Sequence, residues 1–582
     1  WHPRHGLFTS LAEYRQHLDP DRPTVGITFP RSYWLEHNTA HIEALVTAVE
    51  ELDANTVPFF CLRLPDARRG NPGMAQVLEN LLRDDEGRCV VDTLVDVHGM
   101  SMTAGVPANA DAYPNLGVSV LHALTSYAPR AAWQATAQGM GSMDVATQAA
   151  QPEFDGALIT KLLATREADE VDDLTGAVVP RMVPVPGRAQ AMAELALSWA
   201  RLARTPAGQR KVAIVFHHHP PRNDRIGCAS GLDTFESVRQ LLIRMGEEGY
   251  DVPEQFETGD DIAQVLLSCL TCDQRWLTPE QMHERAEAHA DLEISRPWYR
   301  GLPDSVRECM DRNWGPHPGT LFVHDDEFSF AGHLDGNVLL TIQPPRGTFE
   351  AVTDSAIHDP VLPPPHHYLA HYRWIRDVFK ADAVIHVGTH GSLEWLPGKG
   401  LGLSEECYPE LALDRMVNIY PYIINNPGEG TQAKRRSAAA LVDHLTPPMR
   451  QAGLYDSTAE IDRILREHAG AQSQSPQRAR LVAEQVWDAV VEAGLDTDLG
   501  LTAGDVDSDP AELLDKVNHH LLELQDREIS DGLHVLGQLV AGQDDPAAAE
   551  VEYVAQLTRQ PNGQVPSLRE AVLDAWGTSL DE

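Results

Sequence analysis

The first part of the chain alternates between short apolar runs and longer stretches whose apolar residues recur at helical spacing. The predicted strands are residues 24–29, 57–62, 89–97 and 117–121, and the predicted helices are residues 41–52 and 74–83. Buried strands that alternate with amphipathic helices are typical of a parallel sheet with helices on its faces. We therefore predict a first α/β domain at residues 1–130.

A second unit of the same kind begins near residue 188. An alanine-rich helix is predicted at residues 188–203, a strand at 211–216 and a helix at 234–249, with a polar, glycine-containing loop between the last two. Loops that follow the carboxyl ends of parallel strands form the usual ligand sites of α/β proteins. A third cycle of the same pattern begins with a predicted strand at residues 383–386, directly before the densest polar motif in the chain.

The apolar spacing becomes mainly helical from about residue 456 onward. The predicted helices there are residues 457–470, 476–494, 510–527 and 568–576. We therefore predict a multidomain α/β protein whose parallel sheets form Rossmann-like layers, with a mainly helical C-terminal region. The predicted domains are an α/β domain at 1–130, a second α/β domain with a helical linker at 131–330, an α/β domain with the candidate site at 331–455 and the helical region at 456–582.

The charge balance limits the classes of partner. The 582 residues include 46 Lys and Arg against 86 Asp and Glu, which gives a formal net charge of -40 at pH 7. Such a chain repels polyanions, so neither nucleic acid nor an anionic membrane is predicted as a partner. No apolar run approaches the roughly 18 residues of a membrane span. The seven cysteines are scattered, as in a reducing compartment, so we predict a cytoplasmic protein.

The most concentrated chemistry lies in residues 382–399, where His386, His390 and Glu394 follow one another at four-residue intervals. Two imidazoles and a carboxylate suit a borderline divalent ion such as cobalt, nickel or zinc, and they also suit proton transfer. If the chain turns helical soon after Gly388, His390 and Glu394 share one helical face. The alternative is that these are loop histidines that cap backbone groups, a spacing that chance permits among 26 histidines.

A second polar group lies downstream, at residues 418–436. A predicted strand ends in the paired amides Asn425 and Asn426, and a tight turn leads into a basic helix that contains Lys434. Amides, backbone N–H groups and cations suit the carboxylate edges of a ligand. The alternative is a plain turn followed by a solvated basic helix.

Two further residues are candidates for ligand contacts. Arg346 lies in a stiff, proline-containing loop, where it can reach a ligand carboxylate or pair with a surface acid. Three adjacent histidines follow the strand at 211–216, and we favour His217 because neighbouring side chains on an extended segment point to alternate sides. Cys269 and Cys272 have redox or zinc spacing, but no second cysteine pair accompanies them, so we predict that they belong to the core.

The motif at residues 386–399, together with residues 402–404 and 425–436, resembles the family of large subunits shared by aerobic cobaltochelatase and magnesium chelatase. Further segments agree with this family in the same order: residues 8–13, 124–126, 151–156, 227–234, 342–347, 362–366 and 531–534. The residues that resemble the cobalt-type subunit more than the magnesium-type one are Lys399, Ser404, Cys407 and Pro409. Family members are usually much longer and this chain starts at Trp1, so we expect a fragment.

The resemblance implies a large, tetrapyrrole-binding subunit of an ATP-dependent chelatase. In the cobalt branch it implies the insertion of cobalt(II), the substrate metal, into hydrogenobyrinic acid a,c-diamide during cobalamin biosynthesis. It also implies that separate AAA+ ATPase chelatase subunits use the ATP. The sequence agrees with this division of labour, because it contains no Walker-type phosphate loop, and it also lacks the nucleophile elbow of serine hydrolases.

The resemblance further implies roles for individual residues. Glu394 is implied as base or metal ligand, and His386 and His390 as metal ligands, so these three are the predicted catalytic and metal-binding residues. The residues predicted to bind the macrocycle are Arg346, Asn425, Asn426, Glu429, Lys434 and His217. Two alternatives stay open: a magnesium or nickel chelatase large subunit that acts on a porphyrin-type ring, and a non-catalytic tetrapyrrole-binding protein such as a carrier or sensor.

Overall fold

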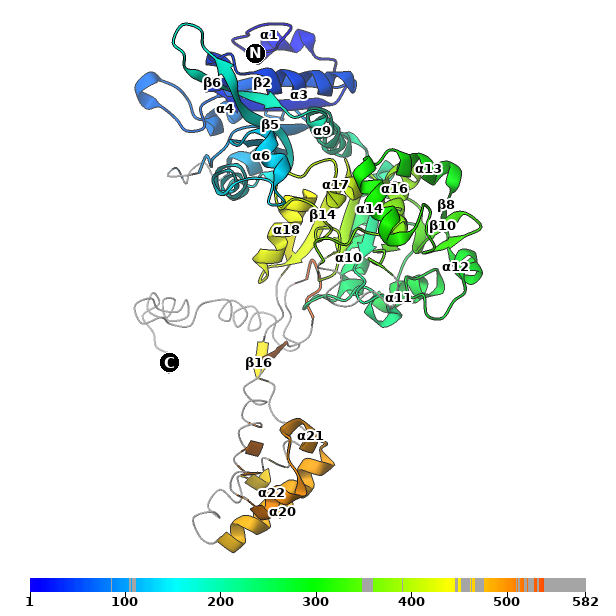
Figure 1. The fold of residues 1–582 in the computed structure, drawn as a ribbon. Coiled ribbons are helices and arrows are strands. Elements are labelled where there is room, and N and C mark those ends of the chain that lie inside the picture. The colour runs from blue at the N-terminus through cyan, green and yellow to red at the C-terminus, as the bar shows by residue number, and fades with distance from the viewer. Residues whose placement is uncertain are drawn as a thin grey trace. The chain divides into compact units, whose positions relative to one another are not determined.

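The computed structural model describes residues 1–84, 86–103, 106, 111–347, 359–389, 391–444, 449–451, 461, 463–465, 476–508, 510, 513–514, 516–517, 521, 528–530 and 533–538. The chain divides into two compact units (Figure 1). The first comprises Trp1–Leu445 with Val535–Gly537, and the second comprises Thr446–His534 with Gln538–Glu582. The predicted start of the helical region, at residue 456, lies close to the junction between them.

The first sheet of unit 1 has the strand order β2-β1-β3-β4-β5-β6 among the described residues. Its strands are β1 (Thr24–Pro30), β2 (Asn55–Cys61), β3 (Thr93–Asp96), β4 (Ser119–Ser126), β5 (Leu158–Val171) and β6 (Val178–Pro184). Neighbouring strands pair in parallel, except that β5 and β6 form an antiparallel pair at the edge. The predicted boundary at residue 130 lies between β4 and β5, which are neighbours in this sheet.

Helices cover both faces of this sheet (Figure 1). One core layer joins Val25, Ile27 and Phe29 of β1 to α3 (Ala40–Glu51) and α9 (Arg188–Arg204). The other layer packs α4 (Met74–Leu81) and α5 (Ala112–Leu116) against the opposite side chains of the strands. The shorter helices of this part are α1 (Leu11–Tyr14), α2 (Arg31–Leu35), α6 (Arg130–Ala135), α7 (Ser142–Asp144) and α8 (Gln151–Phe154).

The second sheet of unit 1 has the order β11-β12-β7-β13-β14-β15 among the described residues. Its strands are β7 (Val212–Phe216), β11 (Gly332–Asp335), β12 (Val338–Ile342), β13 (Ala383–Val387), β14 (Val417–Ile423) and β15 (Ala440–His444). They pair in parallel, apart from the antiparallel pair β11/β12. The predicted boundary at residue 330 separates β7 from its neighbour β12. The four-domain division stays a prediction, and the two sheets group the strands as residues 24–184 and 212–444.

Two core layers flank the second sheet. One contains α10 (Thr234–Glu247), α11 (Gly259–Ser268) and α12 (Pro279–Arg285), and the other contains α13 (Leu292–Arg300), α14 (Asp304–Trp314), α16 (His366–Trp374) and α17 (Tyr408–Leu413). A small antiparallel sheet of β8 (Ala288–Asp291), β10 (Glu327–Phe330) and β9 (Val323–His324) joins these layers, and α18 (Pro427–Ser437) connects β14 to β15.

Polar contacts tie the two sheets of unit 1 together. The indole Nε1 of Trp133 donates to the carbonyl of Gly402 at 2.7 Å. Lys161 and Arg188 both donate to Oε1 of Glu410, at 2.6 and 3.0 Å. All three of these charged side chains are largely buried, so removing Glu410 would leave both cations in the junction without their shared carboxylate.

Unit 2 contains α20 (Pro476–Glu492), α21 (Asp496–Leu499) and α22 (Ala503–Ser508), and an antiparallel pair of β16 (Met449–Gln451) with β17 (Glu528–Ser530). Val482, Val486 and Val490 form its core at helical spacing, as expected from the sequence. The helix predicted at 568–576 lies outside the described residues. In the part of the chain that the structure describes, no helix combines the length and the apolar character needed to span a membrane. The predicted α/β class with parallel-sheet layers is confirmed.

Candidate functional site

The candidate site lies where the strand order of the second sheet reverses. Within this sheet the chain passes from β7 to β11 and β12 on one side of β7, and it then returns to β13 on the other side. The connections therefore diverge between β7 and β13. Phe216, at the end of β7, is in register with Ile342 of β12 and Val387 of β13. The carboxyl ends of these three strands therefore meet at one edge. Such a switch point is where open α/β sheets bind ligands.

His386 lies on β13 inside a chain of hydrogen bonds, with only 2% of its surface exposed. The amide of Asn418 donates to the carbonyl of Ser437, so its Oδ1 faces the ring and accepts from Nδ1–H of His386 at 2.8 Å. Nε2 therefore accepts from the Tyr372 hydroxyl at 2.9 Å. The Tyr420 ring stacks on the imidazole at 5.4 Å between centroids. Both ring nitrogens are thus engaged.

The protonation of His386 follows from this burial. Desolvation lowers its pKa from 6.5 to about 4, although the hydrogen bond to Asn418 acts in the opposite direction. The imidazole is therefore neutral near pH 7, which is the form that binds metals.

Glu394 is fully buried, and its two carboxyl oxygens differ. Oε1 accepts from the backbone N–H of Gly391 at 3.1 Å and from the Tyr420 hydroxyl at 3.3 Å. Oε2 has no hydrogen-bond partner among the described residues. Desolvation raises the pKa of Glu394 from 4.5 to about 8, against the lowering effects of the Tyr420 hydrogen bond and the Arg436 charge. A carboxyl group with such a pKa takes up and releases a proton near neutral pH.

The segment that carries Glu394 differs from the predicted helix. Residues 391–407 form bends and turns, so the expected helical face at Glu394 is wrong, and His390 lies outside the described residues. Side chains hold this segment instead of helical hydrogen bonds. Gln343 Oε1 accepts from the N–H of Ser392 at 2.8 Å, and the Ser392 hydroxyl contacts that of Tyr368 at 2.8 Å.

Gly391 allows this close approach. A Cβ atom at this position would lie 3.0 Å from Nε2 of Gln343, 3.0 Å from the Tyr420 hydroxyl and 3.1 Å from Oε2 of Glu394. Any larger residue would therefore compete for the space beside the carboxyl group.

Arg436 is a site residue that the sequence analysis missed. It donates to the backbone carbonyls of Glu394, Leu396 and Lys399, the last two at 2.6 and 3.1 Å. The sequence does not distinguish Arg436 from the other cations of this basic run. Its neighbour Arg435, for example, pairs with Glu153 at 2.8 Å. The guanidinium therefore fixes the turn that positions Glu394.

The predicted ligand-binding residues of the downstream group, at 418–436, have different roles in the structure. Asn426 caps α18 by accepting from the N–H of Glu429 at 3.4 Å, as the plain-turn alternative predicts. The carboxylate of Glu429 accepts from the Tyr422 hydroxyl at 3.2 Å, and its charge contributes to the raised pKa of Glu394. Asn425 is exposed and Lys434 is half-buried.

His217 and Arg346 both lie near the strand ends. His217 is buried, its N–H donates to the carbonyl of Val387 at 2.8 Å, and a Cβ on Gly388 would lie 2.2 Å from its own Cβ. Arg346 is also buried and donates to the carbonyl of Leu362 at 2.5 Å. Desolvation lowers the pKa of its guanidinium, with a further contribution from the Arg436 charge.

The structure thus brings some predicted residues together and leaves others apart. His386 and Glu394 both contact Tyr420 and lie at the switch point, with His217 beside Gly388. Asn426 is occupied by capping a helix. The supporting residues Gln343, Tyr372, Asn418 and Tyr420 were missed, because their contacts join segments that are distant in sequence.

Comparison with known proteins identifies the family. The model of the CobN/magnesium chelatase family matches residues 1–582. The aerobic cobaltochelatase subunit CobN of Pseudomonas aeruginosa is 33% identical, covering 100% of this chain and 45% of that protein. A magnesium-chelatase subunit of Rhodobacter capsulatus is 30% identical, covering 88% of this chain and 41% of that protein.

A solved structure agrees with these relatives. The catalytic subunit of cobaltochelatase from Mycobacterium tuberculosis is 35% identical and superposes with a TM-score of 0.75, covering 95% of this chain and 46% of that chain. The chain therefore spans less than half the length of the relatives it matches. The match over residues 1–582 shows that the chain belongs to the CobN/magnesium chelatase family.

Proposed function

We propose that this chain is part of the large subunit of an ATP-dependent chelatase that inserts cobalt(II) into hydrogenobyrinic acid a,c-diamide. The observation that carries the proposal is the fully buried carboxyl group of Glu394, which has an unpartnered oxygen among the described residues and a pKa raised to about 8. Its position at the carboxyl edge of a parallel sheet supports a ligand site.

Metal insertion sets the chemical requirements. The entering ion replaces inner N–H hydrogen of the ring, one in a corrin and two in a porphyrin, so a base must accept each proton that leaves. Ionised Glu394 would accept one proton at Oε2, while Gly391 and Tyr420 hold Oε1. Because Glu394 is fully buried, a substrate can reach it only after a covering segment moves.

His386 and His390 are the proposed ligands for the incoming cobalt. The neutral state of His386 fits this role, since only an unprotonated nitrogen binds a metal. To bind cobalt through Nε2, His386 must exchange its hydrogen bond with Tyr372 for the metal.

The remaining assignments concern the macrocycle and the partners. We propose that Arg346, Asn425, Asn426, Glu429, Lys434 and His217 contact the ring or its carboxylate and amide edges. The energy for insertion would come from AAA+ ATPase chelatase subunits, which would use the ATP.

Magnesium insertion into a porphyrin-type ring is the second candidate. The observation in its favour is the similarity to the magnesium-chelatase subunit of Rhodobacter capsulatus, at 30% identity. Cobaltochelatase relatives match at 33–34% identity. This difference favours the cobalt candidate.

An insertion assay separates the candidates. The chain is combined with the ATPase subunits, ATP, either Co²⁺ or Mg²⁺, and either hydrogenobyrinic acid a,c-diamide or protoporphyrin IX. We expect an ATP-dependent shift in ring absorbance with cobalt and the corrin precursor. Turnover only with magnesium and the porphyrin would establish the second candidate. Ring binding, seen by tryptophan quenching, without turnover of either ring would favour a carrier.

A matched pair of variants ties turnover to the site. Glu394→Gln should lower the insertion rate by about 100-fold or more, as expected for loss of a general base. Glu405→Gln, an exposed residue of the same segment, should leave the rate unchanged. Full activity of Glu394→Gln would rule out Glu394 as the base.

A further inference from the structure

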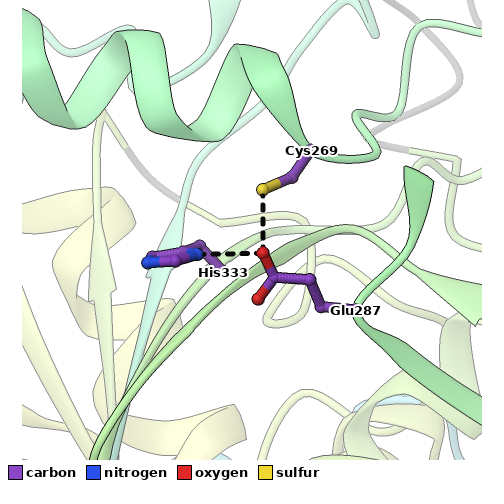
Figure 2. Close-up of side chains that lie close together, drawn as sticks. All are labelled: Cys269, Glu287 and His333. Atoms are coloured by element: carbon purple, nitrogen blue, oxygen red, sulfur yellow. Dashed lines mark hydrogen bonds and ion pairs between the residues drawn. The ribbon is translucent and has the colours of Figure 1, made fainter.

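Cys269, Glu287 and His333 meet at a place separate from the candidate insertion site (Figure 2). Cys269 directly follows α11, Glu287 directly precedes β8, and His333 lies on the edge strand β11. Their thiol, carboxylate and imidazole ligand atoms all lie within 4.8 Å of one another. The fold therefore gathers three different metal-ligand types from segments that are distant in sequence.

The contacts around Glu287 define the geometry. Oε1 of Glu287 accepts from Sγ of Cys269 at 3.3 Å and from Nδ1 of His333 at 3.0 Å (Figure 2). Ligand atoms about 2.0–2.3 Å from a tetrahedral ion lie about 3.3–3.8 Å from one another. The cluster is thus close to the spacing that a bound ion requires, and small side-chain shifts complete it.

Neighbouring groups aim two of these ligands. Nε2 of His333 contacts Oε2 of Glu254 at 2.9 Å, which leaves Nδ1 directed at the cluster. The N–H of Leu334 donates to Oε2 of Glu287 at 2.9 Å, which leaves Oε1 directed at the cluster. A carboxylate on the outer nitrogen of a ligating imidazole is the usual second layer of a metal site.

A cation that binds this cluster must compete with protons for the ligands. Glu287 and Glu254 raise the pKa of His333 against the desolvation that lowers it. Burial and the contact with Glu287 raise the pKa of the Cys269 thiol to about 11. A bound ion would displace the thiol proton and the Nδ1 proton. Side chains of His333 and Glu287 are 20% and 37% exposed, so an ion can enter from solvent.

We propose that Cys269, Glu287 and His333 bind a borderline divalent cation of the Zn²⁺ or Co²⁺ class, with water as the remaining ligand. One soft thiolate with one imidazole and one carboxylate selects such ions over Mg²⁺ and Ca²⁺, which prefer oxygen ligands alone. The site is independent of the proposed insertion chemistry, because it shares no residue with it.

A second cluster of potential metal ligands determines which signal the test must use. His283, His289 and Glu327 also place their ligand atoms within 4.8 Å of one another, but this group contains no thiol. A spectroscopic signal that requires a thiolate therefore separates the two groups.

The experiment is a titration of the metal-free chain with Co²⁺ alone, followed by absorbance. We expect one equivalent of Co²⁺ to produce a near-ultraviolet thiolate-to-cobalt charge-transfer band together with the intense visible bands of tetrahedral cobalt. Zn²⁺ should remove both. Cys269→Ser should abolish the charge-transfer band, whereas Cys309→Ser, a half-buried cysteine of α14, should retain it.

Two more variants test the site even if Cys269→Ser fails to fold. Glu254→Gln keeps all three ligands and should weaken Co²⁺ binding about 10- to 100-fold with the charge-transfer band intact. His333→Gln keeps the thiol and should weaken binding further, with circular dichroism unchanged. No charge-transfer band in the parent chain, or a band that persists in Cys269→Ser, overturns the proposal. Visible bands alone would place the ion at a thiol-free site and overturn it as well.

Discussion

The hydroxyl of Tyr420 donates a hydrogen bond to Oε1 of Glu394 at 3.3 Å, which links β14 to the turn that follows β13. The ring of the same tyrosine stacks on His386. One side chain therefore supports both the proposed base and the proposed ligand. The hydrogen bond favours the ionised carboxylate, so it opposes the desolvation that keeps Glu394 protonated.

Tyr420→Phe tests this support. The substitution keeps the ring against His386 but removes the donor from Glu394. A hydrogen bond to a charged group contributes about 1.5–3 kcal/mol, so the pKa of Glu394 should rise by about one unit or more. We expect the acid limb of the pH–rate profile for metal insertion to move to higher pH by that amount. Tyr250→Phe, whose hydroxyl accepts from Arg210, is the control, and an unmoved limb in Tyr420→Phe would contradict the assignment.

The insertion rate itself should depend on the protonation of Glu394. Only the ionised carboxylate accepts a proton, and burial raises its pKa to about 8. The rate should therefore rise with pH through about pH 8 and level off above it. A stopped-flow or absorbance assay from pH 6 to 9 measures this profile. A rate that is flat over this range would mean that another group is the base.

The same pKa has a consequence for stability. The pKa of Glu394 is raised on folding, from 4.5 to about 8, so the unfolded state releases this proton first as the pH rises. Below about pH 4.5 the carboxyl group is protonated in both states and does not lower the stability of the fold. Between about pH 4.5 and 8 it lowers the unfolding free energy increasingly, by at most about 1.4 kcal/mol per pH unit. Glu394→Gln should gain stability relative to the parent between pH 5 and 8. Urea midpoints at several pH values measure the gain, and a constant difference would contradict it.

The sequence predicted the fold class well, because strand and helix periods follow from local spacing. The strands at 24–29, 211–216 and 383–386 correspond to β1, β7 and β13. The pairing of strands could not be predicted in this way, since β7 pairs with β12, which lies more than a hundred residues later in the chain. Local spacing carries no information on such pairs, and it therefore did not reveal how the strands are shared between the sheets.

The site was predictable at the level of residue types only. The four-residue interval between His390 and Glu394 suggested a helix, yet Gly391, Pro397 and Gly398 favour turns, and Gln343 supplies a hydrogen bond that a helix would have made internally. Asn426 shows the converse, because an amide beside a turn serves as a helix cap as readily as a ligand group.

Gly388→Ala tests the packing that sets the end of β13. The residue has φ +150, and a Cβ there would lie 2.2 Å from Cβ of His217, so either the backbone or the loop after β7 must shift. We expect a loss of more than about 2 kcal/mol in unfolding free energy, measured by urea titration. Gly246→Ala in α10 is the control, because nothing lies within 4 Å of its added Cβ and alanine favours helix. Equal stability of the two variants would show that the crowding is absent.

Arg436→Gln tests how the turn around Glu394 is fixed. The substitution removes the charged donors from the carbonyls of Glu394, Leu396 and Lys399, and it also removes a positive charge that lowers the pKa of Glu394. Charge-assisted hydrogen bonds contribute about 1.5–3 kcal/mol each, so amides of residues 391–400 should exchange at least about tenfold faster. The acid limb of the insertion profile should move to higher pH.

A control separates this turn from a general loss of positive charge. Arg244→Gln removes an exposed guanidinium that pairs with Glu247, and it should change neither readout. If Arg436→Gln sped up exchange without moving the acid limb, the guanidinium would hold the turn but would not influence the carboxyl group. The pKa of Glu394 would then be set by desolvation together with its other neighbours, such as Tyr420 and Glu429.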